Sequence, residues 1–171
     1  MGFTFEKIWL QEALRRTIET HDFTVDHVVA WANRHALFDD VTFLIEGVAA
    51  WFDGDYVKSV NVLVPQIESG LRSIGDKIGE PVTKARRPGS GVGVSVGMGD
   101  ILNSGDIRQV LGPDLILYFL ALYADPRGMT LRNRVAHGLI KPEFVEESLV
   151  IALIHTLLVF GVWKELAERR R

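Results

Sequence analysis

The chain has 171 residues, 47% hydrophobic and 24% charged, which is enough for one globular domain with a sizeable core and excludes disorder over most of its length. Its net charge of −3 excludes a uniformly basic protein, so any contact with nucleic acid would need a local patch. The absence of cysteine excludes disulfides, thiolate zinc sites and cysteine nucleophiles, and it suits a reducing compartment such as the cytoplasm.

Hydrophobic periodicity predicts helices through the first half of the chain, over residues 5–20, 25–37, 39–54 and 55–79. Thr24 and Asp55 are placed to cap the second and the fourth of these helices. Pro65 falls inside the fourth pattern and predicts a kink there, because proline removes one backbone hydrogen bond.

Residues 80–100 have a different composition from the rest of the chain. Three basic residues, Lys84, Arg86 and Arg87, precede a glycine-rich run in which valine alternates with small residues. A period of two predicts a short β-hairpin, and the glycines allow an ordered loop instead. The basic residues are candidates for RNA contact, with a solvated loop as the alternative.

Helical spacing resumes after residue 100. We expect short helices over 100–112, a helix over 113–124, a turn at 125–128, a helix over 131–140 and a last helix over 142–168. The apolar stretch Ser148–Trp163 is shorter than the roughly 20 residues that a membrane span needs, so we expect a buried helix and no membrane. The whole chain is predicted to be one all-α domain, in which residues 1–40 extend a bundle formed by 41–171.

The decapeptide "LRNRVAHGLI", Leu131–Ile140, places polar and charged residues within an apolar run. On a regular helix Leu131, Val135, Gly138 and Leu139 share one side, which would dock on the core. Asn133 and His137 then lie on the opposite side. Arg132 and His137 would be about 140° apart around the helix axis. The two side chains can converge only if the long arginine side chain reaches across, if the start of the helix is irregular, or if the second group comes from another subunit.

These residue types together suit the cleavage of RNA without a metal. Histidine titrates near neutral pH and serves as general acid or base, while a guanidinium binds phosphate and stabilises negative charge. Asparagine can orient the histidine or a ligand oxygen. The alternative is an ordinary surface histidine beside arginines that cap a helix end or pair with acids.

The segment "RNRVAH", Arg132–His137, resembles the R-x4–6-H signature of the HEPN superfamily (higher eukaryotes and prokaryotes nucleotide-binding), in which a polar residue commonly follows the arginine. With "LVPQIESGLR" before the glycine-rich loop and "DPRGMTLRNRVAHG" after it, the chain resembles a bacterial HEPN-type family catalogued as a domain of unknown function. The resemblance covers roughly residues 45–163.

The resemblance implies a helical bundle that forms a homodimer, with the two motifs facing each other in one composite site. It implies a metal-independent endoribonuclease, without cofactor, in a bacterial toxin, phage-defence or RNA-processing system, with an antitoxin or other protein as partner. Arg132 and His137 would be catalytic with Asn133 in support. Beside what the resemblance implies, we expect Arg134 to contact RNA or a partner chain. The same superfamily includes modules that only bind nucleotide, RNA or protein, and that alternative remains open.

Overall fold

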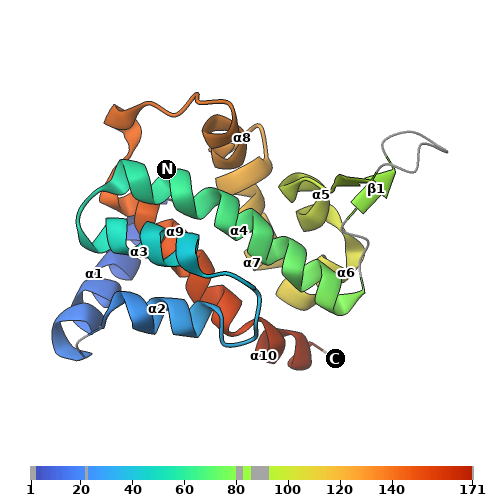
Figure 1. Cartoon of the computed structure of the whole chain (residues 1–171), viewed down its shortest axis with the longest axis horizontal. Coiled ribbons are helices and arrows are strands. Elements are labelled where there is room, and N and C mark those ends of the chain that lie inside the picture. The colour runs from blue at the N-terminus through green and yellow to red at the C-terminus, as the bar shows by residue number, and fades with distance from the viewer. Residues whose placement is uncertain (1–2, 22, 80–82, 86–92, 171) are drawn as a thin grey trace. The chain divides into compact units, whose positions relative to one another are not determined.

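The computed structural model describes residues 3–21, 23–79, 83–85 and 93–170, and these are overwhelmingly helical (Figure 1). The all-α prediction is therefore confirmed. Two strands of three residues, β1 (Thr83–Ala85) and β2 (Gly93–Ser95), pair antiparallel with Lys84 opposite Val94. They lie within the segment where alternating valines predict a hairpin.

The chain divides into two compact units. The first contains the residues up to Ile67 together with Ile140–Gly161, and the second contains Glu68–Leu139 together with the residues from Val162 onward. The long helix α4 (Tyr56–Ile78) contributes its first half to one unit and its second half to the other.

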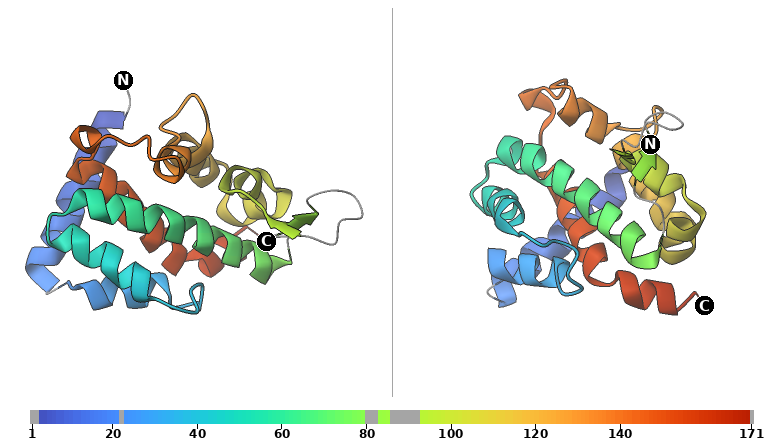
Figure 2. Two further views of the ribbon diagram at one scale, coloured as in Figure 1. Left: turned by 45° about the horizontal axis from the view of Figure 1, so that its top comes forward. Right: turned by 45° about the vertical axis from the view of Figure 1, so that its right-hand side comes forward.

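The remaining elements of the first unit are α1 (Phe3–His21), α2 (Val25–Ala32), α3 (Thr42–Phe52), the 3₁₀ turn η2 (Pro142–Phe144) and α9 (Glu147–Gly161). Helix α9 is buried along most of its length, and α1, α2 and α3 all pack against it (Figure 2). Gly161 lets the indole of Trp31 lie directly against the backbone of α9, since a Cβ there would collide with the ring. The Trp31 Nε1 donates to the carbonyl of Leu158 at 3.0 Å, so this aromatic contact also satisfies its polar atom.

Two predicted helix ends in the first unit are wrong. Helix α2 stops at Ala32 instead of continuing to residue 37, because the Asn33 side chain closes a loop onto Phe38. Asn33 Nδ2 donates to the Phe38 carbonyl at 3.0 Å, and its Oδ1 accepts from the Phe38 amide at 2.9 Å. These two bonds replace the helical ones that the chain gives up.

The last helix begins later than predicted and is interrupted. Pro142 opens only the short turn η2, and α9 starts at Glu147. The helical run then breaks at Val162 before α10 (Trp163–Glu168), so the predicted single helix over 142–168 is wrong. Proline suits the first residue of a 3₁₀ turn as well as that of an α-helix, so Pro142 alone could not distinguish them.

Pro65 lies inside α4, and the helix continues through it. Proline leaves the carbonyl of Asn61 without its helical donor. Both residues are exposed, so water can hydrate that carbonyl.

Burial of His155 on α9 predicts a pH dependence of stability. Burial lowers the pKa of His155 below its ordinary value near 6.5. The unfolded chain therefore binds more protons as the pH falls below about 6.5, and the free energy of unfolding decreases there; the full contribution is present above that pH. Urea titrations across this range should show a shallower dependence for His155→Leu, whereas His21→Ala, at an exposed histidine of α1, should keep the wild-type slope.

Besides the strands, the second unit contains α5 (Met98–Asn103), α6 (Gly105–Leu111), α7 (Pro113–Phe119), the π-helical turn η1 (Leu120–Ala124), α8 (Leu131–Ala136) and α10. Helix α6 packs on α5, α7 and α10, while η1 packs on α5 and α8. The core of the second unit includes fully buried side chains from α5, α6, α7 and η1: Leu102, Ile107, Leu111, Phe119 and Tyr123.

The turn predicted at Asp125–Gly128 is confirmed, and it is held tightly. The amide of Gly128 donates to the Asp125 carbonyl at 2.9 Å. Both carboxylate oxygens of Asp125 accept from the Arg127 guanidinium, at 2.7 and 3.0 Å, and one also accepts the Arg127 amide at 2.8 Å. Hydrogen bonds from Arg127 lower the pKa of Asp125 to about 2, so the turn keeps its carboxylate charged at any ordinary pH.

Gly128 and Thr130 bring the chain from η1 into α8. Gly128 lies so close to Ala121 that a Cβ would collide with the Ala121 carbonyl, and that carbonyl accepts from the amide of Met129 at 2.8 Å. The π-helical turn makes this possible, because its wider winding leaves the Ala121 carbonyl outside the helical hydrogen-bond pattern. The backbone of Thr130 then takes the left-handed conformation, with φ of 47°.

A left-handed conformation is unfavourable for a β-branched residue, at roughly 1 kcal/mol. We therefore expect Thr130→Gly to raise the free energy of unfolding by about 0.5 kcal/mol, after the greater backbone entropy of glycine is counted. Urea denaturation followed by circular dichroism measures the change. The control Thr17→Gly, inside α1, should instead lose a few tenths of a kcal/mol, roughly the difference in helix propensity. Destabilisation by Thr130→Gly would show that the threonine side chain stabilises this turn.

Candidate functional site

Helix α8 carries the predicted motif but is shorter than predicted. It ends at Ala136, with His137 at the C-cap and Gly138 in the left-handed conformation at φ of 62°. The amide of Leu139 donates to the Arg134 carbonyl at 2.7 Å, and that of Gly138 donates to Val135 at 3.1 Å. This pair of bonds is a Schellman motif, and glycine is the residue that fits its left-handed position.

The predicted apolar stripe over Leu131–Ile140 is therefore wrong beyond Ala136. Leu131 is buried and Val135 is half-buried, but Leu139 lies after the helix and its side chain is 65% exposed. The helix is held to its unit mainly through its first turn. Its C-terminal end, where His137 lies, projects toward solvent.

Arg132 forms an ion pair with Glu68, on α4. The Nε of Arg132 donates to Glu68 Oε2 at 2.8 Å, and its Nη2 donates to Glu68 Oε1 at 3.4 Å. The Glu68 side chain is only 12% exposed and that of Arg132 is 35% exposed. The hydrogen bond that Arg132 donates to Glu68 raises the pKa of Arg132 above its already high ordinary value. Arg132 is therefore a fixed, charged group at the surface of the second unit.

Within the segments that the structure describes, the pairing leaves one edge of the Arg132 guanidinium available. A guanidinium has five N–H groups, and the side edge formed by Nε and Nη2 faces Glu68. Nη1 makes a long contact of 3.4 Å to the Oδ1 of Asn133. The end edge, formed by Nη1 and Nη2, keeps two N–H groups in the parallel arrangement that binds a phosphate or carboxylate. Arg132 and Asn133, neighbours in the sequence, thus also contact each other through their side chains at the start of α8.

Glu68 and Arg72 are parts of this cluster that the sequence did not identify as site residues. Arg72, one helical turn after Glu68, donates its Nη2 to Glu68 Oε1 at 3.0 Å and to the carbonyl of Val96 at 3.3 Å. Both residues lie in the segment "LVPQIESGLR", which supplied part of the HEPN resemblance. The spacing of four between Glu68 and Arg72 on a predicted helix signals an ion pair, but nothing local connects either residue to Arg132.

His137 and Arg134 are exposed. His137 and Arg132 both lie within the described segments, and no hydrogen bond joins them there. The structure therefore brings together Arg132 and Asn133 of the predicted catalytic residues, and leaves His137 apart at the other end of α8.

The basic residues predicted to contact RNA lie partly outside the described structure. Lys84 belongs to β1, where its backbone pairs opposite Val94. Arg86 and Arg87 fall outside the described residues.

A cavity of about 530 Å³ in the second unit lies apart from the motif. It is formed by residues of α4, α6 and α10 with the chain that follows, among them Lys77, Gln109 and Trp163, and Arg132, Asn133, Arg134 and His137 do not line it. Over the described segments, no group of three or more histidine, aspartate and glutamate side chains is arranged to hold a metal ion.

No protein family, curated protein or solved structure matches this chain. None of the described helices is by itself long and apolar enough to cross a membrane. Taken together, α6 and the helical run Pro113–Ala124 have the length and composition of a span, but the two are bent by 109° relative to each other.

Proposed function

We propose that this chain is a HEPN-type, metal-independent endoribonuclease that works as a homodimer in the cytoplasm. The observation that carries the proposal is the Arg132 guanidinium, which Glu68 holds by one edge while the phosphate-binding edge remains available. An arginine fixed in this way is suited to steady the crowded phosphate of an RNA strand during cleavage.

The proposed chemistry needs one proton acceptor and one proton donor besides that cation. His137 takes the proton of the ribose 2′-hydroxyl, whose oxygen then attacks the adjacent phosphorus. The bond from phosphorus to the 5′-oxygen breaks, and that oxygen receives a proton. The products are a 2′,3′-cyclic phosphate and a 5′-hydroxyl. Asn133 orients the phosphate beside Arg132, and Arg134 contacts the strand, together with Lys84, Arg86 and Arg87.

A second copy of the chain completes the proposed site. Arg132 is directed toward Glu68, whereas His137 caps the other end of α8, so one chain does not bring the two groups together. In a two-fold dimer Arg132 of one chain can approach the partner's His137, and two histidines then supply the acid and the base. A toxin or phage-defence role, with an antitoxin or other partner protein, follows from the HEPN resemblance only.

The second candidate function is a non-catalytic module that binds nucleotide, RNA or protein. The ion pair favours it over the nuclease, because Glu68 offsets the positive charge of Arg132 that would have to stabilise the developing negative charge during cleavage. A module of this kind would bind RNA without cleaving it.

The two functions separate in one assay. The purified chain is incubated with mixed RNA in EDTA, beside the same RNA carrying 2′-O-methyl groups. Cleavage of the unmodified RNA alone, leaving 2′,3′-cyclic phosphate ends, supports the endoribonuclease. Binding of both RNAs without cleavage supports the module, and equal cleavage of both would exclude the proposed attack by the 2′-hydroxyl.

Arg132→Lys is expected to lower cleavage about 100-fold, the loss typical of removing one preorganised donor to a developing charge. The single ammonium of lysine can pair with Glu68, but it has no second edge with which to bind the phosphate at the same time. Rates on a short RNA measure the effect, and thermal unfolding should stay close to wild type because the ion pair persists. Full activity of Arg132→Lys would show that charge alone matters at this position.

A further inference from the structure

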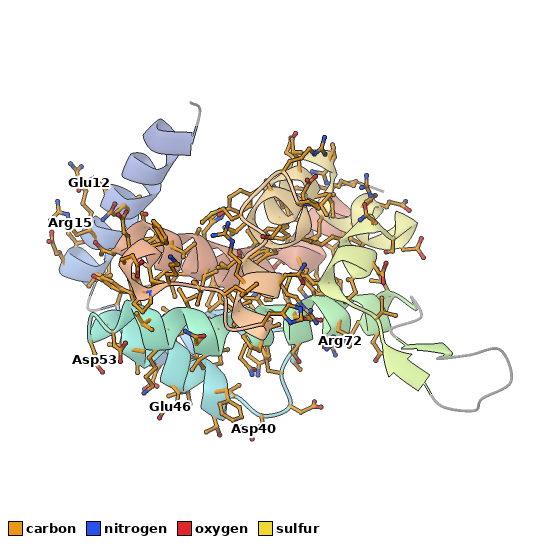
Figure 3. All side chains as sticks on the ribbon, turned by 90° about the horizontal axis from the view of Figure 1, so that it is seen from above. Glu12, Arg15, Asp40, Glu46, Asp53 and Arg72 are labelled. Atoms are coloured by element: carbon orange, nitrogen blue, oxygen red, sulfur yellow. The ribbon has the colours of Figure 1, made fainter. Side chains whose placement is uncertain are left out.

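Arg72 holds a more constrained position than an arginine in an ordinary helical ion pair. Its side chain is 29% exposed, and its Nη2 contacts both Glu68 and the carbonyl of Val96. Among the described residues, its Nε is buried without a hydrogen-bond partner, which is unfavourable for a charged group. The hydrogen bonds that Nη2 donates to Glu68 and Val96 therefore hold the guanidinium in place. Figure 3 labels Arg72 on α4.

Glu68 connects Arg72 to the motif. Its Oε1 lies 3.0 Å from Nη2 of Arg72 and 3.4 Å from Nη2 of Arg132, so one carboxylate oxygen serves two guanidiniums. A carboxylate has about four acceptor positions and can accept from both. Since the Glu68 side chain is 12% exposed, a second cation also reduces the penalty of removing its charge from water.

We propose that Arg72 is a positioning residue, which fixes the carboxylate of Glu68 and thereby directs the free edge of Arg132. It acts through Glu68 and does not itself contact the substrate. Because its Nη2 also bonds to Val96, the residue directly after β2, the same guanidinium joins the strand pair to the motif helix within the second unit. The phosphate role of Arg132 rests on the proposed function, but the positioning does not.

Direct binding of a ligand by Arg72 is less consistent with its geometry. The side edge of its guanidinium is formed by Nε, which is buried, and Nη2, which already has two acceptors. Only Nη1 remains, and a single N–H donor group lacks the paired arrangement that makes arginine selective for phosphate. Arg132, with its free end edge, is the better ligand group of the two.

The test measures the order of Arg132 directly, without any RNA. Nitrogen-15 spectra of the full chain resolve arginine Nε–H groups, and the Arg132 signal is assigned by its loss in Arg132→Lys. Hydrogen exchange of that group is compared among wild type, Arg72→Gln, Arg72→Lys and Glu68→Gln. The matched control is Arg16→Gln, which removes an exposed arginine paired four residues away with Glu12 on α1.

We expect the exchange of the Arg132 Nε–H to be about tenfold faster in Arg72→Gln, as when a charge-assisted hydrogen bond is weakened by ~1.4 kcal/mol. Arg72→Lys should accelerate it less, because an ammonium pairs with Glu68 but does not reach Val96 as well. This variant also carries the test if the glutamine variant does not fold. Arg16→Gln should leave the rate unchanged.

The proposal is overturned if both Arg72 variants exchange at the wild-type rate while Glu68→Gln exchanges faster, since Glu68 then orients Arg132 alone. A wild-type rate in Glu68→Gln overturns it as well. Absence of RNA cleavage by the wild-type chain would refute the proposed nuclease and leave this result unaffected, so the two failures are distinguishable.

Discussion

His137→Ala is expected to reduce RNA cleavage in EDTA about a thousandfold, within the range for removing a positioned general acid or base. His137 is the proposed proton acceptor, and alanine has no group that titrates. The fold should not change, because the His137 side chain is exposed. The backbone amide of residue 137 donates a hydrogen bond to the Asn133 carbonyl at 3.0 Å, and alanine retains it. Initial rates with a short labelled RNA, and far-ultraviolet circular dichroism of both proteins, measure the two effects.

His21→Ala is the control for this experiment, since it removes an exposed histidine at the end of α1 that does not belong to the motif. It should cleave at the wild-type rate. Loss of cleavage in His137→Ala together with full cleavage in His21→Ala would exclude a contaminating nuclease as the source of the activity. Mixing His137→Ala with Arg132→Ala extends the test. Some mixed dimers bring the Arg132 of one chain to the His137 of the other, and they should recover only the part of the activity that a single histidine supports. Equal cleavage by wild type and His137→Ala would refute the assigned role of His137.

Gly128→Ala is expected to lower the free energy of unfolding by about 3 kcal/mol, the upper part of the usual range for overpacking. The added Cβ would meet the backbone of Ala121, including its carbonyl oxygen, and backbone cannot move aside as a flexible side chain does. The collision also disturbs the bond of 2.8 Å between Met129 and Ala121, which fixes the chain just before α8. Urea denaturation gives the change in stability.

Gly105→Ala is the matched control for that prediction. Gly105 is the first residue of α6, and a Cβ there meets nothing within 4 Å. Alanine should therefore be neutral or slightly stabilising at this position. A change of less than 1 kcal/mol in Gly128→Ala, roughly that of a tolerated surface substitution, would show that η1 and the turn can separate without loss.

If α8 depends on this turn, partial unfolding of Gly128→Ala should affect the motif before the rest of the second unit. Hydrogen exchange of the backbone amides of α8 is expected to accelerate more than that of the amides of α6. One such amide is that of Arg134, which donates to the Thr130 carbonyl at 3.0 Å. Cleavage should fall together with this local order, even under conditions where most of the chain remains folded.

Local signals in the sequence predicted much of the fold. Helical spacing of apolar residues identified the long helix that is α4 and the buried helix that is α9, because each pattern reports which side of a helix faces the core. The turn at Asp125–Gly128 was readable from residue types, since aspartate, proline and glycine each favour turn conformations.

Some local signals were present and were outweighed by the apolar pattern. Gly138 is a typical C-terminal glycine, yet Leu139 and Ile140 continue the hydrophobic run and favoured a longer helix. The structure shows that Leu139 is exposed, so the run did not report burial there. Asn33 likewise ends α2 through its side-chain hydrogen bonds to Phe38, and the spacing of apolar residues does not indicate such bonds.

The sequence by itself determined that the protein is helical and that Arg132, Asn133 and His137 lie on or at the end of one helix. Only the tertiary structure decided that Arg132 pairs with Glu68, 64 positions earlier, and that Arg72 shares the same carboxylate. The physical reason is that periodicity and capping depend on neighbours within one or two turns. An ion pair between distant segments depends on how α8 and α4 pack, and one sequence does not specify that arrangement directly.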